Sequence, residues 1–427
     1  MSQPKLLDDC FLHDKDRLRH DEALAILRDR LVTVTGTEDV PLADALGRVI
    51  AAGVTAPRQV PAADNSAVDG YAFAHADYEA TGGFFPLSAR IAAGHPSGSE
   101  LQVASAARIF TGALMPGRAD TVAMQEDCET HSQDGQDFVI IPPGLKPGAN
   151  RRKAGEDLQQ GAAIVEPGTI LRPQEIGAIA STGAGAATCF EPLRVAVLST
   201  GDEILKAGDP FRPGGVYDSN RPLLAALLAT LPVEVTDLGI LPDSADTVRA
   251  ALTDAAATHH AVLTTGGASR GEEDHVVATL GDLGQRHMWQ LAIKPGRPMT
   301  FGQIGDCVVL GLPGNPVAAF VCFVLYVRQA LLALSGATWR EPRRLVLKAD
   351  FEIASKKPDR REFLRGLLVE DEAGIRRVAK YPRDGSGLIT SLREADGLIE
   401  IPEDATSLAK GDSVRFLPFS EVGLPAR

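Results

Sequence analysis

The chain has 427 residues, and its 44% hydrophobic and 23% charged residues are typical of an ordinary soluble protein. This length favours about two to four domains over a single core. The formal net charge of −13 argues against a general nucleic-acid or membrane-surface binder, because either needs a basic face. The five cysteines are scattered and form no CxxC pair, so a disulfide framework or zinc site is disfavoured and a cytoplasmic location is expected.

Two segments are candidates for a signal or membrane-spanning sequence. The N-terminus, MSQPKLLDDC, has no apolar signal core. The most apolar run, Pro316–Val327, then meets Arg328 and Gln329. It is much shorter than the roughly 20 residues that a membrane span needs. We therefore predict a buried helix and no membrane partner.

The first part of the chain reads as a helix followed by short strands. Residues 21–31 have the apolar spacing of a helix. Proline and glycine then separate short strand-like runs, which include Ala106–Phe110 and Val139–Ile141. This pattern predicts a small β-rich domain over residues 51–154.

From Leu193 onward, strands alternate with helices. The predicted strands are Arg194–Leu198, Val233–Leu238 and Ala261–Thr265, and the predicted helices are Ser219–Leu231, Asp243–Ala257, Glu273–Leu283 and Val317–Leu334. Such alternation predicts a mostly parallel sheet covered on both faces, here an α/β domain over residues 193–338. After Trp339, short strands at Arg344–Phe351, Ile375–Val378, Leu398–Ile401 and Ser413–Leu417 predict a small C-terminal β-barrel or sandwich over residues 339–427. The fold class is therefore multidomain α/β.

The most informative loop follows the strand Ala261–Thr265. It contains Gly266, Gly267, Ala268, Ser269, Arg270 and Gly271, followed by Glu272, Glu273 and Asp274. A strand, a glycine-rich turn and a helix present backbone N–H groups to an anion. Three carboxylates beside an anion require a divalent metal between them. The loop predicts a phosphate-bearing ligand held with help from a metal such as Mg²⁺.

Five further loops carry polar groups, and each has an ordinary explanation when taken alone. The segments GDE at 201–203, DNSAVDGY at 64–71 and GLPGNP at 311–316 also suit plain turns. The segments RRK at 151–153 and KPGR at 294–297 also suit solvated charges. Together with the 266–274 loop, however, they exceed what turns alone require. No Walker A, G-x-G-x-x-G or H-E-x-x-H motif accompanies them, which disfavours standard ATPases, dinucleotide oxidoreductases and zinc proteases.

The ordered motif set resembles one known family. The motifs are DNSAVDGYAF, RIFTGALMP, RVAVLSTGDEI, YDSNR, TTGGASRGEEDH, LAIKPGRPMTFG and GLPGNP, in that order. Together they resemble the molybdopterin molybdenumtransferases, the family of MoeA and of the matching domain of gephyrin. The match runs from about Asp21 to Phe416.

The resemblance implies an activity and an architecture. Family members insert molybdenum from molybdate into adenylylated molybdopterin, with release of AMP and help from Mg²⁺. The implied subunit has four parts and forms a homodimer. Residues 1–50 and 155–192 would form a linker and dimerisation domain, and the β-rich domain would reach the partner's site. Implied protein partners are the molybdopterin adenylyltransferase and molybdoenzyme chaperones.

The resemblance also assigns site residues. The expected catalytic residues are Asp274, Glu203, Asp243, Lys294, Asp69 and Asp157. Of these, Asp274, Glu203 and Asp243 are the expected metal ligands. The expected substrate-binding residues are Thr111, Arg152, Gly266, Gly267, Ser269, Gly271, Arg297, Pro313, Gly314, Asn315, Pro316, Arg365 and Ser386.

Several positions depart from the family pattern and keep two alternatives open. Gln290 stands where many members have lysine, Ala154 where a basic residue is common, and Arg270 where a small apolar residue is usual. Glu273 takes a position that is often alanine. One alternative is therefore a non-catalytic carrier or scaffold that binds molybdopterin. The other is a molybdopterin adenylyltransferase, a single α/β domain, which the β-rich segments before Leu193 and after Trp339 disfavour.

Overall fold

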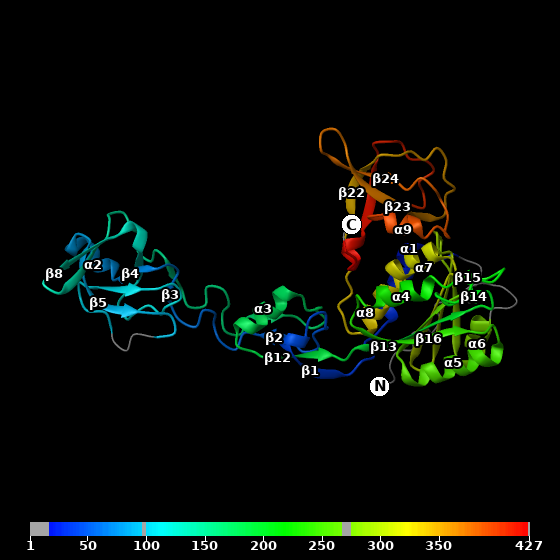
Figure 1. Ribbon diagram of the computed structural model, residues 1–427, viewed down its shortest axis with the longest axis horizontal. Coiled ribbons are helices and arrows are strands. Elements are labelled where there is room, and N and C mark those ends of the chain that lie inside the picture. Colours follow the sequence, from blue (N-terminus) through cyan, green and yellow to red (C-terminus); the bar gives the residue numbers. More distant parts are fainter. Residues whose placement is uncertain (1–16, 96–99, 267–274, 426–427) are drawn as a thin grey trace.

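The computed structural model is elongated, with a β-rich domain at one end and an α/β domain and a β-barrel at the other (Figure 1). It describes residues 17–95, 100–266 and 275–425. A narrow connector of short paired strands and one helix joins the two ends (Figure 1).

The β-rich domain is built on a six-stranded sheet with strand order β7-β4-β6-β5-β9-β8. Its elements are β4 (Gly70–Phe73), α2 (His75–Thr81), β5 (Phe84–Ile91), β6 (Ala106–Ile109), β7 (Thr121–Met124), β8 (Glu129–Gln133) and β9 (Gln136–Ile140). Because side chains alternate along strands, the sheet buries two apolar clusters, one around Phe73 and Phe85 and another around Ile91 and Ile109. A β-rich domain is present as the sequence predicts.

The connector consists of antiparallel pairs between its outgoing and returning segments. These pairs are β1 (Thr37–Pro41) with β12 (Ala186–Phe190), β2 (Val54–Thr55) with β11 (Ala163–Val165), and β3 (Asn65–Ser66) with β10 (Arg151–Arg152). The helix α3 (Pro173–Ser181) lies beside them (Figure 1). Backbone pairing thus ties the two connector segments together although the whole β-rich domain lies between them in the sequence.

The α/β domain contains a six-stranded sheet with strand order β16-β13-β17-β21-β20-β18. The strands are β13 (Leu193–Thr200), β16 (Val233–Leu241), β17 (Ala261–Thr265), β18 (Gln285–Gln290), β20 (Pro298–Ile304) and β21 (Cys307–Leu312). The first four strands in this order are parallel, and β20 and β18 are antiparallel to their neighbours. A short pair, β14 (Ile204–Leu205) with β15 (Val216–Tyr217), follows β13. The predicted parallel sheet is confirmed, but β18, β20 and β21 were not predicted.

Helices cover both faces of this sheet, as predicted. One face packs against α1 (His20–Arg30), α4 (Asn220–Leu228), α7 (Pro316–Cys322) and α8 (Arg328–Leu334). The other face packs against α5 (Ala245–Thr258) and α6 (His275–Leu283). A π-helical turn, η3 (Phe323–Val327), joins α7 to α8. In the described part of the chain, Pro316–Leu334 is the one helix long and apolar enough to cross a membrane, and it is 89% buried in the protein, so its predicted role as a core helix is confirmed.

The predicted helix Ser219–Leu231, with Ser219 or Asn220 as its cap, is right at its beginning and too long at its C-terminal end. The helix begins at Asn220 and ends at Leu228. The Ser219 side chain makes no capping hydrogen bond. Instead, Asp218 Oδ1 accepts hydrogen bonds from the backbone N–H groups of Asn220 and Arg221, at 3.1 and 3.0 Å. A carboxylate just before the first turn satisfies free N–H groups and complements the helix dipole.

The C-terminal domain is a closed barrel of five strands, which settles the choice between barrel and sandwich. The strands are β22 (Leu345–Ala349), β23 (Arg361–Glu370), β24 (Arg376–Lys380), β25 (Gly397–Ile401) and β26 (Ser413–Pro418), and α9 (Thr390–Glu394) precedes β25. The ring closes through pairing of β23 with β25. The strand β19 (Ile293–Lys294) leaves the α/β domain and pairs with β23, which was not predicted.

Polar contacts and a shared apolar core hold the barrel on the α/β domain. Buried His20 Nδ1 lies 2.8 Å from the Tyr326 hydroxyl of the π-helical turn. Arg361, at the start of β23, donates to Asp21 of α1 at 2.9 Å and to Glu400 of β25 at 2.9 Å. One continuous apolar cluster includes residues of α1, the sheet, α7 and α8, and the barrel. The shared apolar cluster and the buried contacts of His20 and Glu400 pack the two domains against each other.

Candidate functional site

The carboxyl ends of parallel strands bring three predicted loops to one edge of the sheet. Thr265 ends β17, and the loop after β21 contains Gly314. Asn220 of α4 ties these two strand ends together, since its Nδ2 donates to Thr265 Oγ1 and to the Gly314 carbonyl, each at 2.7 Å. Gly266 has φ +84°, and a Cβ at this position would lie 3.1 Å from the carbonyl oxygen of Thr200, the last residue of β13. Only glycine fits there without strain.

A cavity of about 640 Å³ lies between this edge and the barrel, and we call it the basic cleft. It gathers residues from the α/β domain, from β23 and from the loop after β24. Among its lining are eight of the predicted site residues, namely Gly266, Lys294, Arg297, Pro313, Gly314, Asn315, Arg365 and Ser386. Pro316 is next to this group as the first residue of α7. The structure thus unites residues that the sequence separates by more than a hundred positions.

Arg365 of β23 is the most unusual charge in the basic cleft. It is 4% exposed, and burial lowers the pKa of its guanidinium. Its hydrogen bonds go to Ser391 Oγ at 3.1 Å and to the carbonyls of Arg383 and Gly385 at 3.2 and 3.4 Å. Among the described residues, no carboxylate lies within ion-pair distance of it. A buried cation without a carboxylate partner favours an anionic ligand, because desolvated charges need compensation.

Lys294 has a carboxylate partner. Its Nζ lies 3.4 Å from Glu362 Oε1, and the two residues are register partners in the β19–β23 pair. The Lys294 side chain is 47% exposed and that of Glu362 is 11% exposed. The ammonium therefore reaches the cleft, but its charge is partly offset by the barrel.

The predicted acidic residues of the α/β domain lie outside the lining of the basic cleft. Glu203 follows β13, and Asp243 follows β16. Their loops are adjacent, since the backbone N–H of Asp243 donates to Asp202 Oδ1 at 3.1 Å. Within residues 17–95, 100–266 and 275–425, no three His, Cys, Asp or Glu side chains are grouped so as to hold a metal ion. Asp274 and the predicted loop residues Gly267, Ser269 and Gly271 lie outside the described residues.

A second group of predicted residues lies in and beside the β-rich domain. Asp69 accepts hydrogen bonds from the Thr111 backbone N–H at 2.8 Å and from Thr111 Oγ1 at 2.7 Å. These bonds, the backbone one first, lower the pKa of the Asp69 carboxyl. Exposed Arg152 of β10 pairs with Asn65 of β3, and exposed Asp157 follows in the return segment.

The structure does not bring these two groups together within one chain. The β-rich domain with Asp69 and Thr111 lies at one end of the molecule, and the basic cleft lies at the other (Figure 1). The connector with β1, β12 and α3 separates them (Figure 1).

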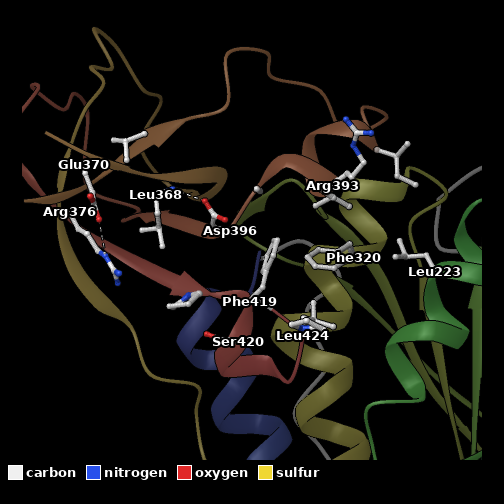
Figure 2. Close-up of a pocket in the computed structure, with 16 residues that line it drawn as sticks. Leu223, Phe320, Leu368, Glu370, Arg376, Arg393, Asp396, Phe419, Ser420 and Leu424 are labelled. Carbon is white, nitrogen blue, oxygen red and sulfur yellow. Dashed lines mark hydrogen bonds and ion pairs between the residues drawn. The ribbon is translucent and has the colours of Figure 1, made fainter. Parts of the chain in front are cut away.

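A second cavity, of about 780 Å³, opens on another side of the contact between the barrel and the α/β domain, and we call it the apolar cleft. Phe320, Phe419 and Leu424 point toward its centre, while Arg376 and Glu370 lie toward one side (Figure 2). None of the predicted site residues lines it. The larger cavity is therefore not the one to which the motifs contribute.

Sequence reasoning missed several residues of the basic cleft and its supports. Asp218 and Asn220 stand in the quoted YDSNR motif, but no role was assigned to them. Asp384, which lines the cleft, stands two residues before the predicted Ser386. Phe363 also lines the cleft, and the alternation of strand β23 places it on the same face as Arg365. That alternation was the available signal, but β23 itself was not predicted.

The fold and the cleft define a class of protein. It is a multidomain α/β protein with a cavity lined by basic residues between strand ends and a β-barrel, and with a separate β-rich domain on a connector. Family models match the chain in the same order: the MoeA N-terminal region (domain I and II) over residues 18–183, a probable molybdopterin binding domain over residues 196–333, and the MoeA C-terminal region (domain IV) over residues 346–419.

Relatives and solved structures agree with these models. A molybdopterin molybdenumtransferase of Haemophilus influenzae is 34% identical over 94% of this chain and 98% of its own length. A molybdopterin molybdenumtransferase of Bacillus subtilis is 30% identical over 90% of each chain. A molybdopterin biosynthesis MoeA protein from Pyrococcus horikoshii has a TM-score of 0.79 and 27% identity, covering 94% of this chain and 100% of its own. This chain belongs to the MoeA family.

Proposed function

We propose that this chain is a molybdopterin molybdenumtransferase, which inserts molybdenum from molybdate into adenylylated molybdopterin and releases AMP. The observation that carries the proposal is the basic cleft, in which buried Arg365, without a carboxylate ion-pair partner among the described residues, meets the loops of the α/β domain. The family and its curated relatives support the same activity. No observation favours the non-catalytic carrier or the single-domain adenylyltransferase.

The basic cleft offers suitable groups for an oxyanion. Arg365, Arg297 and Lys294 supply positive charge, and charge-assisted hydrogen bonds from such groups are the strong ones. Pro313 and Pro316 restrict the backbone of the loop that contains Gly314 and Asn315, so its groups lose little entropy on binding. We assign molybdate to this cleft, with the phosphate-bearing substrate reaching it from the Gly266 side. As AMP leaves, the same cations would stabilise the negative charge that develops on the leaving phosphate.

Release of AMP tests the proposed activity. Purified protein, adenylylated molybdopterin, Mg²⁺ and molybdate should give AMP, measured by chromatography, well above a boiled control. Folded protein that binds the pterin substrate but releases no AMP would refute the enzymatic role. Complementation of a strain that lacks molybdenum insertion, with wild type and Asp274→Ala, gives an independent test. We expect the cytoplasm to be the location of this activity.

We also propose that Mg²⁺ assists the reaction, with Asp274, Glu203 and Asp243 as ligands. Bound there, the metal would neutralise charge on the leaving phosphate. The described carboxylates do not by themselves form a metal site, so the proposal depends on Asp274. Treatment with EDTA should abolish AMP release, and added Mg²⁺ should restore it. Undiminished release in EDTA would remove the metal from the mechanism.

We further propose that the active site is shared between two copies of the chain in a homodimer. The separation of Asp69 and Thr111 from the basic cleft supports this arrangement (Figure 1). Co-expression of Asp69→Ala and Arg365→Ala chains, purified through two different tags, should restore about half of wild-type AMP release, because each mixed dimer contains one intact site out of two. Activity no higher than that of either variant alone would place each site within one chain. We also propose the molybdopterin adenylyltransferase and molybdoenzyme chaperones as protein partners of this homodimer.

A further inference from the structure

The backbone around Arg297 is held in place by its neighbours. The preceding Gly296 has φ +104°, and a Cβ there would lie 2.6 Å from Cys322 Sγ of α7. Cys322 Sγ in turn lies 3.4 Å from the Gly296 carbonyl, to which it donates. On the other side, the Leu291 N–H donates to the Arg297 carbonyl at 2.9 Å. The turn is therefore fixed, but the long Arg297 side chain is exposed and needs a partner to hold its guanidinium in one place.

Gln290 supplies that partner. Gln290 is the last residue of β18 and the register partner of Pro298, so it lies directly across from the turn. Arg297 Nη2 donates to Gln290 Oε1 at 3.1 Å. Among the described residues, no carboxylate forms an ion pair with Arg297. The guanidinium is thus oriented by a neutral acceptor and keeps its full charge for a ligand.

The other charges of the basic cleft show why a neutral partner matters. The Lys294 ammonium is offset by Glu362 at 3.4 Å, and Asp384 also lines the cleft. Arg365 is buried without a carboxylate partner. A glutamate at position 290 would pair with Arg297 and remove its charge from the cleft, and a lysine would repel it. The glutamine amide accepts a hydrogen bond from the guanidinium and carries no charge of its own, so the positive charge of Arg297 is not offset.

We propose that Gln290 is a positioning residue, whose amide oxygen holds the Arg297 guanidinium at the basic cleft as a ligand for a tetrahedral oxyanion. The inference rests on the proposed function only in taking molybdate as that oxyanion. In this proposal, Gln290 and Arg297 contribute to oxyanion binding through a single shared interaction. Loss of either should weaken oxyanion binding, and loss of both should cost no more than loss of Arg297 alone.

A double-mutant cycle tests this unit by direct binding of molybdate to the full chain, measured by calorimetry without the pterin substrate. Gln290→Met should weaken binding about threefold and Arg297→Met about tenfold, and the double variant should match Arg297→Met. Gln290→Glu should weaken binding about tenfold, because the carboxylate competes with the oxyanion for the guanidinium. Arg376→Met is the matched control: it removes the same charge from the apolar cleft and should leave binding unchanged.

The outcomes separate the inference from the proposed enzyme. Additive losses in the double variant, wild-type affinity in Gln290→Glu, or no molybdate binding by the folded wild type would each overturn the role of Gln290. Molybdate binding with the expected cycle but no AMP release would refute the enzyme and support the positioning role. In an active enzyme, Gln290→Met should raise the molybdate concentration for half-maximal AMP release and leave the rate at saturating molybdate unchanged. A lower rate of AMP release at saturating molybdate, with an unchanged molybdate concentration for half-maximal release, would contradict the positioning role of Gln290.

Discussion

The basic cleft and the apolar cleft flank the same contact between the α/β domain and the barrel, yet they differ in chemistry. In the apolar cleft, charged groups are satisfied within the protein: Arg376 pairs with Glu370 at 3.8 Å, and Asp396 Oδ2 accepts the Leu368 N–H at 2.8 Å. In the basic cleft, Arg365 has no such carboxylate partner. The apolar cleft is the larger of the two, at about 780 against 640 Å³. A buried arginine without an ion-pair partner among the described residues, and not volume, therefore distinguishes the candidate site.

The largest expected effect is on stability, at the apolar cleft. Phe320 is 4% exposed and packs edge-on against Phe419 with ring centroids 5.1 Å apart. Phe320→Ala should lower the free energy of unfolding by about 3–5 kcal/mol, measured by urea denaturation, because it leaves a cavity in a shared core. The molybdate affinity of the folded variant should not change. A parallel loss of molybdate affinity would show that the two clefts are coupled.

The next effect concerns the basic cleft itself. Arg365→Met should lower molybdate affinity or AMP release by about a hundredfold, because it removes a desolvated, charge-assisted donor. Arg393→Met in the apolar cleft is the matched control, since the Arg393 side chain is 80% exposed. Thermal unfolding should be followed for both variants, because Arg365 also bonds Ser391. If Arg365→Met and Arg393→Met lost molybdate affinity or AMP release to the same extent, the basic cleft would not be the molybdate site.

A smaller effect is expected at Lys294, whose charge Glu362 already offsets. Lys294→Ala should raise the molybdate concentration for half activity by about tenfold, with little change in unfolding. Titration of AMP release with molybdate checks this. An unchanged molybdate dependence would assign Lys294 to the β19–β23 contact alone.

The effect that is smallest per pH unit concerns His20, which is buried against Tyr326 where α1 meets the α/β domain. Burial, and then the nearby charge of Arg361, lower the pKa of His20 from 6.5 to about 3. Below about pH 6.5 the unfolded chain therefore binds a proton that the folded chain does not, so stability falls as pH falls toward 3. Wild type should lose about 1 kcal/mol per pH unit more than His20→Gln over this window, measured by urea denaturation at several pH values. Identical slopes would mean that His20 is not buried in its neutral form.

Much of the fold followed from local patterns. The alternation of strands and helices after Leu193 predicted the parallel sheet, and the length of the apolar run at Pro316–Val327 predicted a core helix. The strands β18 and β20 escaped prediction because an antiparallel edge is stabilised by pairing with strands elsewhere in the chain. The long strand β23 escaped for the same reason, and its partners include β19 from another domain. The strand β21, which lies inside the sheet and pairs in parallel with β17, was also missed.

The sequence by itself determined which residue types are available to the basic cleft, because the glycines, prolines, arginines and lysine of the motifs have properties that no arrangement supplies to other side chains. Only the tertiary structure decided how those charges act. It paired Lys294 with Glu362 and Arg297 with Gln290, and it buried Arg365 without a carboxylate partner. It also placed the β-rich domain, next to which Asp69 stands, at the opposite end of the molecule from the basic cleft. These outcomes depend on contacts between residues distant in sequence, and such contacts, unlike the motifs, leave no trace in local spacing.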